Sequence, residues 1–133
     1  MKPSPEDYTE IANLLGHYCL ALDHDDFDGW RACFTPDGGL HAYGRAYVGE
    51  AGLRKVMNTA PKGLHLGGLP AVEILGPDRA QTQQNLWFVD RVSGEARRTV
   101  YTDELHRTDD GWRIHARHAQ FLVADGLSDR PGG

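Results

Sequence analysis

Four side chains of this sequence could together move protons on an organic molecule without a metal or a cofactor: Asp23, Tyr43, His65 and Tyr101. An imidazole beside a carboxylate can act as a base near neutral pH, and phenols can donate hydrogen bonds to a carbonyl oxygen. The first three lie on different predicted elements. Only a fold that wraps helices over a curved sheet would therefore bring them together.

Each of these side chains has a possible role and an ordinary alternative. His65 is the predicted base, and Asp23 would fix its tautomer and stabilise the imidazolium. Tyr43 and Tyr101 would stabilise a developing enolate. The alternatives are a satisfied core or turn histidine, a solvated helix end and two amphipathic packing tyrosines. Asp103 shares a strand face with Tyr101 and could pair with Arg117.

The first predicted helix spans residues 5–24 and positions Asp23. Ser4 can cap it, and Pro5 suits the first helical position. Asp23 lies on the shoulder of the apolar stripe, so it faces along that stripe. Residues at helical spacing form the stripe: Tyr8, Ile11, Leu15, Cys19 and Leu22.

The remaining elements are two more helices followed by strands. The second helix carries Phe27, Trp30 and Phe34, and it ends in a turn over residues 35–39. Three helices before an antiparallel sheet indicate an α+β domain, and long strands bent at glycines would curl into a cone with a pocket at its mouth. The other expected elements are a strand at 40–43, a helix at 50–59, a strand at 64–75 broken at Gly67, Gly68 and Pro70, and strands at 80–92, 98–107 and 112–123.

Length and composition favour one domain over residues 1–133, with a core at about 5–123 and a flexible, frayed tail at 124–133. The net charge of −5 argues against a nucleic-acid partner. No apolar run is long enough to span a membrane, and the N-terminus has no apolar core of a secretory signal, so we expect a cytoplasmic protein. Cys19 and Cys33 are expected to be reduced, buried thiols.

Neither a metal nor a cofactor is predicted. His115 and His118 are three residues apart on a predicted strand, so we expect them to face opposite sides of the sheet. The histidines and cysteines show no CxxC, HxH or HExxH spacing. Gly67 and Gly68 precede Leu69 and Pro70 rather than a helix, which argues against a phosphate loop.

Two segments connect the chain with a known family: LDHDDFDGWRACFTPDG early and YTDELHRTDDGWRIHARH late. With the order of elements, they resemble the SnoaL-like branch of the nuclear-transport-factor-2-like (NTF2-like) superfamily over roughly residues 6–122. The resemblance implies a conical α+β fold with a curved, mostly antiparallel sheet covered by three helices. It also implies a homodimer formed through the outer sheet face. The superfamily includes dehydratases, ketosteroid isomerases, polyketide cyclases, epoxide hydrolases and non-catalytic binding subunits.

Within this superfamily, scytalone dehydratases are the most similar in their chemical positions. Asp23 matches the aspartate of a Tyr-Asp pair, with Leu22 in place of the tyrosine, and Tyr43 matches a pocket tyrosine. His65, in HLGG, matches a histidine before a Gly-Gly strand. Scytalone dehydratases have a second catalytic histidine on the next long strand. This sequence reads LWFVDRV there and has no matching histidine, and Asp90 is the nearest polar residue.

We therefore predict a cofactor-independent, dehydratase-like lyase that acts on a small hydrophobic or polyketide-like carbonyl compound. An isomerase or cyclase with the same base, and a non-catalytic binding module, remain the alternatives. His65, Asp23 and Tyr43 are the predicted catalytic residues. The predicted substrate-binding residues are Tyr18, Leu22, Phe88, Asp90, Tyr101 and His118.

A homodimer is also expected from the pattern of the strands themselves. On strand 80–92, Trp87 and Val89 alternate with Leu86 and Phe88, so both faces of this strand are apolar. One face must line the core, and the other would leave an exposed apolar patch on a monomer.

Overall fold

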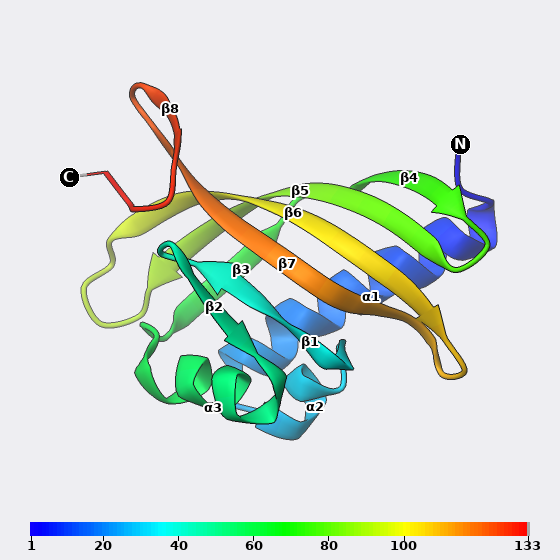
Figure 1. Ribbon diagram of the computed structural model, residues 1–133. Helices are drawn as coiled ribbons and strands as arrows, with labels where there is room; N and C mark the ends of the chain where they lie inside the picture. Colours follow the sequence, from blue (N-terminus) through cyan, green and yellow to red (C-terminus); the bar gives the residue numbers. More distant parts are fainter. Residues whose placement is uncertain (133) are drawn as a thin grey trace.

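The computed structural model describes residues 1–132, which form three helices and a curved eight-stranded sheet (Figure 1). The elements follow one another in the order α1 (Pro5–Asp23), α2 (Phe27–Arg31), β1 (Phe34–Ala42), β2 (Arg45–Val48), α3 (Gly49–Thr59), β3 (Gly63–Gly67), β4 (Ala71–Gly76), β5 (Arg79–Asp90), β6 (Ala96–Thr108), β7 (Gly111–Val123) and β8 (Gly126–Ser128).

The sheet order is β2-β1-β7-β6-β5-β3, with β4 also paired to β5 and β8 paired to β7. All pairs are antiparallel except β1 with β7. The long strands β5, β6 and β7 pass in front of α1, and α2 and α3 lie below them (Figure 1). This is the predicted α+β fold with a curved, mostly antiparallel sheet and three helices. No helix of the described chain is long and apolar enough to cross a membrane.

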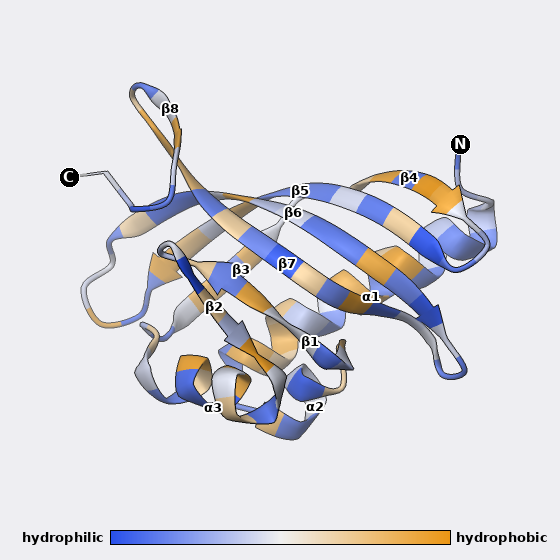
Figure 2. Cartoon of the chain, viewed as in Figure 1, coloured by the Kyte–Doolittle hydropathy of each residue, from blue (hydrophilic) through white to orange (hydrophobic). Residues whose placement is uncertain are grey.

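Alternation along the long strands gives the sheet two different faces. On β6, Thr99, Tyr101, Asp103 and Leu105 are buried, and the residues between them are more exposed. Figure 2 shows the corresponding change between hydrophobic and hydrophilic residues along the sheet. We call the buried side, which packs against α1, the inner face, and the other side the outer face.

The N-terminal half of the first helix is fixed to the sheet. Ser4 caps α1 as predicted, since its side chain accepts a hydrogen bond from the Asp7 backbone at 3.0 Å. Asp7 accepts one from the indole of Trp112 at 3.0 Å, and Glu10 accepts one from the Trp112 backbone at 2.9 Å. These contacts place the N-terminal half of α1 across β7.

A buried ion pair lies on the inner face of the sheet. Arg117 donates to the Asp103 carboxylate at 2.7 and 3.1 Å, and both side chains are fully buried, which confirms the predicted pairing. Gln84 accepts a further hydrogen bond from Arg117 at 2.9 Å, and Thr82 donates to Asp103 at 2.8 Å. Burial removes both charges from water, so each charge is stabilised mainly by its partner.

The structure corrects the sequence prediction in the segment after α2. Phe34 begins β1 and does not belong to the second helix, and residues 35–39 lie within this strand. The Cys33 carbonyl accepts a hydrogen bond from the Ile114 backbone at 2.8 Å, and Phe34 pairs with Ile114. Pairing with the distant strand β7 therefore holds this segment in an extended conformation, although its turn-forming residues had predicted a turn at the end of the second helix.

Two further segments form strands that the sequence did not predict. Arg45–Val48 forms β2 and pairs with β1. Residues 124–133 were expected to be frayed, but Gly126–Ser128 forms β8 and pairs with β7. Gly126 has a φ of 118°, a positive value that glycine adopts readily and other residues rarely do. This backbone conformation allows the tight turn back onto β7.

We expect Asp103→Asn to lower the free energy of unfolding by about 3–5 kcal/mol, because it leaves the buried Arg117 without its counter-charge. Urea unfolding followed by tryptophan fluorescence measures the change. Glu104→Gln on the same strand is the matched control, since its pair with Arg79 is exposed and should cost less than about 1 kcal/mol. Equal losses of unfolding free energy from the two substitutions would show that the buried pair contributes no more stability than the exposed one.

Candidate active site

A cavity of about 390 Å³ lies between the inner face of the sheet and the helices α1 and α3. Its size is in the range of small-molecule sites. Most of its lining is apolar, and its polar groups include His65, Tyr43, Tyr18, Tyr101 and Arg97. Helix α1, strands β1 to β3 and the long strands all contribute to this lining. Residues far apart in the sequence therefore meet around one space.

Asp23 and His65 form a close pair beside this cavity. The Nδ1 atom of His65 lies 2.5 Å from Oδ1 of Asp23, and each side chain is 12% exposed. The backbone N–H of His65 also donates to the same carboxylate, at 2.9 Å to Oδ2 and 3.1 Å to Oδ1. The last residue of α1 thus holds both the main chain and the side chain of the central residue of β3.

The carboxylate determines which nitrogen of His65 is available for chemistry. A carboxylate only accepts hydrogen bonds, so Nδ1 carries the proton and Nε2 keeps a lone pair. Burial lowers the pKa of His65, and this effect outweighs the hydrogen bond and charge of Asp23, which raise that pKa. The ring lining the cavity is therefore neutral at pH 7 and can accept a proton at Nε2.

The local sequence around His65 allows this close approach. His65 pairs in register with Phe88 of β5, and the two rings pack with centroids 4.8 Å apart. A Cβ atom at Gly63 would lie 2.0 Å from the Val89 carbonyl oxygen and 2.8 Å from the Phe88 ring. Only glycine at this position lets β3 pass so close to β5 at the cavity wall.

Tyr43 reaches the cavity from the turn between β1 and β2. Its φ is 55°, and Gly44 after it has a φ of 72°, so two successive left-handed residues form the turn. The Tyr43 hydroxyl oxygen accepts a hydrogen bond from Arg97 at 2.8 Å. This leaves the hydroxyl proton of Tyr43 free to point towards a bound molecule, and the guanidinium charge strengthens it as a donor.

Two more tyrosines lie deeper in the cavity, above the buried ion pair. The guanidinium of Arg117 lies 4.3 Å from the ring centre of Tyr18 and 3.8 Å from that of Tyr101. Burial raises the pKa of both phenols, so they stay protonated. Within the described chain, the buried hydroxyl of Tyr18 has no hydrogen-bond partner. Such a group can be satisfied by a polar atom of a bound molecule.

The structure brings most of the predicted site residues together and leaves two out. Leu22 and Phe88 line the cavity with the residues described above. Asp90 does not: its carboxylate accepts hydrogen bonds from the backbones of Val92 and Ser93 in the turn after β5. Its predicted position in the substrate site is wrong, because the strand ends there and the carboxylate caps the turn.

His118 also lies outside the cavity, which corrects its assignment to the substrate site. It is exposed on the outer face and stacks on His41, with ring centres 4.4 Å apart. The buried neighbours Arg117 and Ala119 face inward, and alternation turns His118 the other way.

Arg97 is a site residue that the sequence analysis missed. It lies two positions before Thr99 and four before Tyr101, and all three line the cavity. The period-two alternation that places Tyr101 on the inner face also places Arg97 there. The same pattern could therefore have found this residue, but not its hydrogen bond to Tyr43.

The fold agrees with the family to which the chain belongs. Residues 3–118 match the model of the SnoaL-like domain, so the chain belongs to that family. The uncharacterised protein Rv2910c of Mycobacterium tuberculosis is 31% identical over 124 residues, which cover 84% of this chain and 82% of that protein.

Solved structures share the fold at lower identity. A variant of Rv3472, a protein of unknown function from Mycobacterium tuberculosis, has a TM-score of 0.82 and 24% identity, with 92% of this chain and 80% of that chain covered. The hexachlorocyclohexane dehydrochlorinase LinA-type3 from Novosphingobium barchaimii has a TM-score of 0.77 and 17% identity, with 94% and 89% covered. At these identities, the similarity shows the NTF2-like fold.

We expect the His65 ring to titrate below its ordinary pKa of 6.5, and Asp23→Asn to move its midpoint lower still, because the carboxylate favours the charged ring. The unfolded chain takes up this proton nearer 6.5, so the contribution of His65 to stability declines as the pH falls below that value. NMR titration of the ring nitrogens measures the midpoint.

Asp25→Asn is the matched control for this titration, since Asp25 pairs with Lys62 and not with His65. It should leave the midpoint unchanged. A wild-type midpoint above 6.5, or one that Asp23→Asn does not lower, would contradict the assigned balance between burial and charge.

Proposed function

We propose that this protein is a cofactor-independent acid–base enzyme, a dehydratase-like lyase that acts on a small hydrophobic, polyketide-like carbonyl compound. The observation that carries the proposal is the 2.5 Å contact between His65 Nδ1 and Asp23, with the imidazole lining a mostly apolar cavity. A neutral, oriented imidazole with a free nitrogen is suited to general base catalysis.

The proposed reaction starts at a carbon next to the carbonyl group. His65 Nε2 takes the proton from that carbon, and Asp23 stabilises the imidazolium that forms. Tyr43, held by Arg97, donates a hydrogen bond to the carbonyl oxygen as negative charge develops on it. The imidazolium then returns its proton to a leaving hydroxyl group, which departs as water.

The cavity supports this substrate class. A volume of about 390 Å³ and walls such as Leu22, Leu40 and Phe121 suit a compact apolar molecule. The unpaired hydroxyl of Tyr18 adds a second donor for an oxygen on that molecule. The same base and phenols would serve an isomerase or cyclase, which needs no leaving group.

The protein is further proposed to act as a homodimer in the cytoplasm. The outer face carries Leu64, Leu66 and Trp87, which are 55%, 57% and 53% exposed and lie side by side because Leu66 pairs with Trp87. An apolar patch of this kind is typical of a protein interface. Cys19 and Cys33 are free thiols, in keeping with a reducing compartment.

Proton abstraction can be tested before the natural substrate is known. We expect the protein to exchange the α-protons of 2-tetralone or cyclohexanone for deuterium in D₂O, as followed by NMR. His65→Ala should slow this exchange by about 10²–10⁴-fold, the usual contribution of a positioned base. Asp23→Asn should act in the same direction, and the double variant should be less than additive because the pair works as a unit.

His17→Ala is the control, since His17 is exposed on α1 and does not line the cavity. A β-hydroxyketone in the same assay separates elimination, which releases water, from isomerisation. Exchange that survives both the His65 and Asp23 substitutions within about threefold would refute the assigned base.

The dimer is tested by sedimentation velocity at micromolar concentration. We expect wild type to sediment with twice the mass of one chain, and Trp87→Lys to give the single-chain mass because it places a charge in the apolar patch. Val92→Lys, at a position 92% exposed in the turn after β5, should leave the dimer intact. A monomeric wild type would rule out this assembly.

A further inference from the structure

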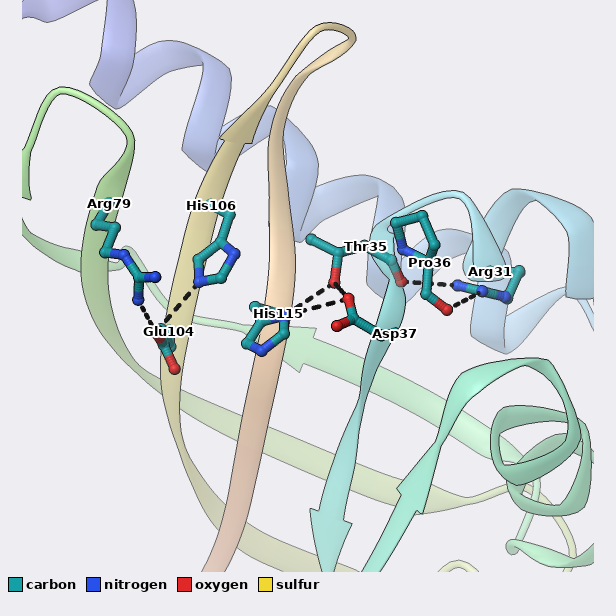
Figure 3. Close-up of polar contacts among 8 residues, drawn as sticks. All are labelled: Arg31, Thr35, Pro36, Asp37, Arg79, Glu104, His106 and His115. Carbon is teal, nitrogen blue, oxygen red and sulfur yellow. Dashed lines mark hydrogen bonds and ion pairs between the residues drawn. The ribbon is translucent and has the colours of Figure 1, made fainter.

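A second group of titratable side chains, one glutamate and two histidines, lies on the outer face, on the opposite side of the sheet from the cavity. Glu104 and His106 come from β6 and His115 from β7, and their side chains turn towards one another (Figure 3). One carboxylate oxygen and one imidazole nitrogen from each histidine all lie within 4.8 Å of one another. The three side chains are 43%, 24% and 29% exposed, so solvent reaches them.

Strand pairing explains why this cluster forms. Glu104 and His106 are two residues apart on one strand and therefore share a face. On β7, Ile114 pairs with Leu105 and Ala116 pairs with Glu104, which leaves His115 as the extra residue of a β-bulge. The bulge places the His115 ring on the His106 ring, with centres 4.1 Å apart and planes 10° apart.

This bulge also corrects the expectation that His115 and His118 face opposite sides of the sheet. The extra residue shifts the alternation, so that both rings lie on the outer face, His115 against His106 and His118 against His41. The local spacing of histidines therefore could not reveal the cluster.

Neighbouring side chains orient the His115 ring. Thr35 donates its hydroxyl proton to Asp37 at 3.3 Å, so its oxygen accepts a hydrogen bond from His115 Nδ1 at 3.0 Å. Asp37 also lies 3.7 Å from Nδ1. With the proton held on Nδ1, Nε2 keeps its lone pair. A histidine that binds a metal is commonly oriented in this way, by a hydrogen bond from its other nitrogen.

Glu104 is held in the cluster by two partners. Its Oε1 lies 3.2 Å from His106 Nε2 and accepts a hydrogen bond from Arg79 at 2.7 Å. The Arg79 side chain is 60% exposed, so its ion pair with Glu104 is weak and can be displaced. Arg79 thus balances the charge of Glu104 and competes with any other cation for it.

We propose that Glu104, His106 and His115 form a binding site for a divalent transition-metal ion of the zinc class. Two imidazoles and one carboxylate are a ligand set that Zn²⁺ accepts, with water in the fourth position. Bonds of about 2.1 Å place tetrahedral ligands about 3.4 Å apart, so the partly exposed side chains must rotate to bring their ligand atoms from within 4.8 Å to this separation. The site is independent of the proposed acid–base chemistry, since none of the three residues lines the cavity.

Isothermal titration calorimetry of the untagged full chain with ZnCl₂ tests the site. We expect wild type to bind one ion per chain, and the double variant His106→Ala/His115→Ala to bind at least about tenfold more weakly. MgCl₂ should give no binding at the same concentrations, because Mg²⁺ prefers oxygen ligands. Circular dichroism establishes that the variant is folded.

The double variant His41→Ala/His118→Ala is the matched control. It removes another stacked pair of histidines from the same face, with ring planes 20° apart, and should leave the zinc affinity unchanged. Arg79→Ala should tighten zinc binding severalfold, because it frees the carboxylate of Glu104 from its competitor.

Three results would overturn the proposal. They are no saturable zinc binding by wild type, equal affinity in the His106→Ala/His115→Ala variant, or equal loss in the His41→Ala/His118→Ala control. Weaker binding by a folded Arg79→Ala variant would also contradict the assigned ligand set, since removal of a competing cation can only favour the metal at Glu104.

Discussion

The Asp23 carboxylate is the interaction on which the arrangement of the site depends. It accepts hydrogen bonds from the backbone and the ring of His65, and so it joins the end of α1 to the edge strand β3. A mostly buried carboxylate requires such partners, because it has lost most of its hydration. One requirement of electrostatics therefore both closes the helix over the sheet and leaves a neutral imidazole with its free nitrogen available to the cavity.

The floor of the cavity follows from a second electrostatic requirement. Arg117 is fully buried and donates hydrogen bonds to Asp103 and Gln84, while the rings of Tyr18 and Tyr101 cover it. This support keeps two protonated phenols in fixed positions at the inner face. Tyr18 and Tyr101 are thus held by a contact outside the cavity lining, and they are already oriented before any molecule binds.

The two faces of the sheet carry different chemistry because β-strands alternate. The inner positions of β6 include Arg97 and Tyr101, which line the cavity, and the outer positions include Glu104 and His106, which form the cluster with His115. Neighbouring residues of one strand therefore belong to two separate candidate sites. The sheet separates them, so that either site can be altered by substitution without direct contact with the other.

The sequence by itself determined the class of fold and predicted the pairing of Asp23 with His65. Capping at Ser4, the apolar stripe of the first helix and the late alternating strands are local patterns, and local patterns report elements and faces. Tertiary structure decided the start of β1 at Phe34 and the bulge at His115. These depend on pairing between distant strands, and no local pattern specifies the register of that pairing.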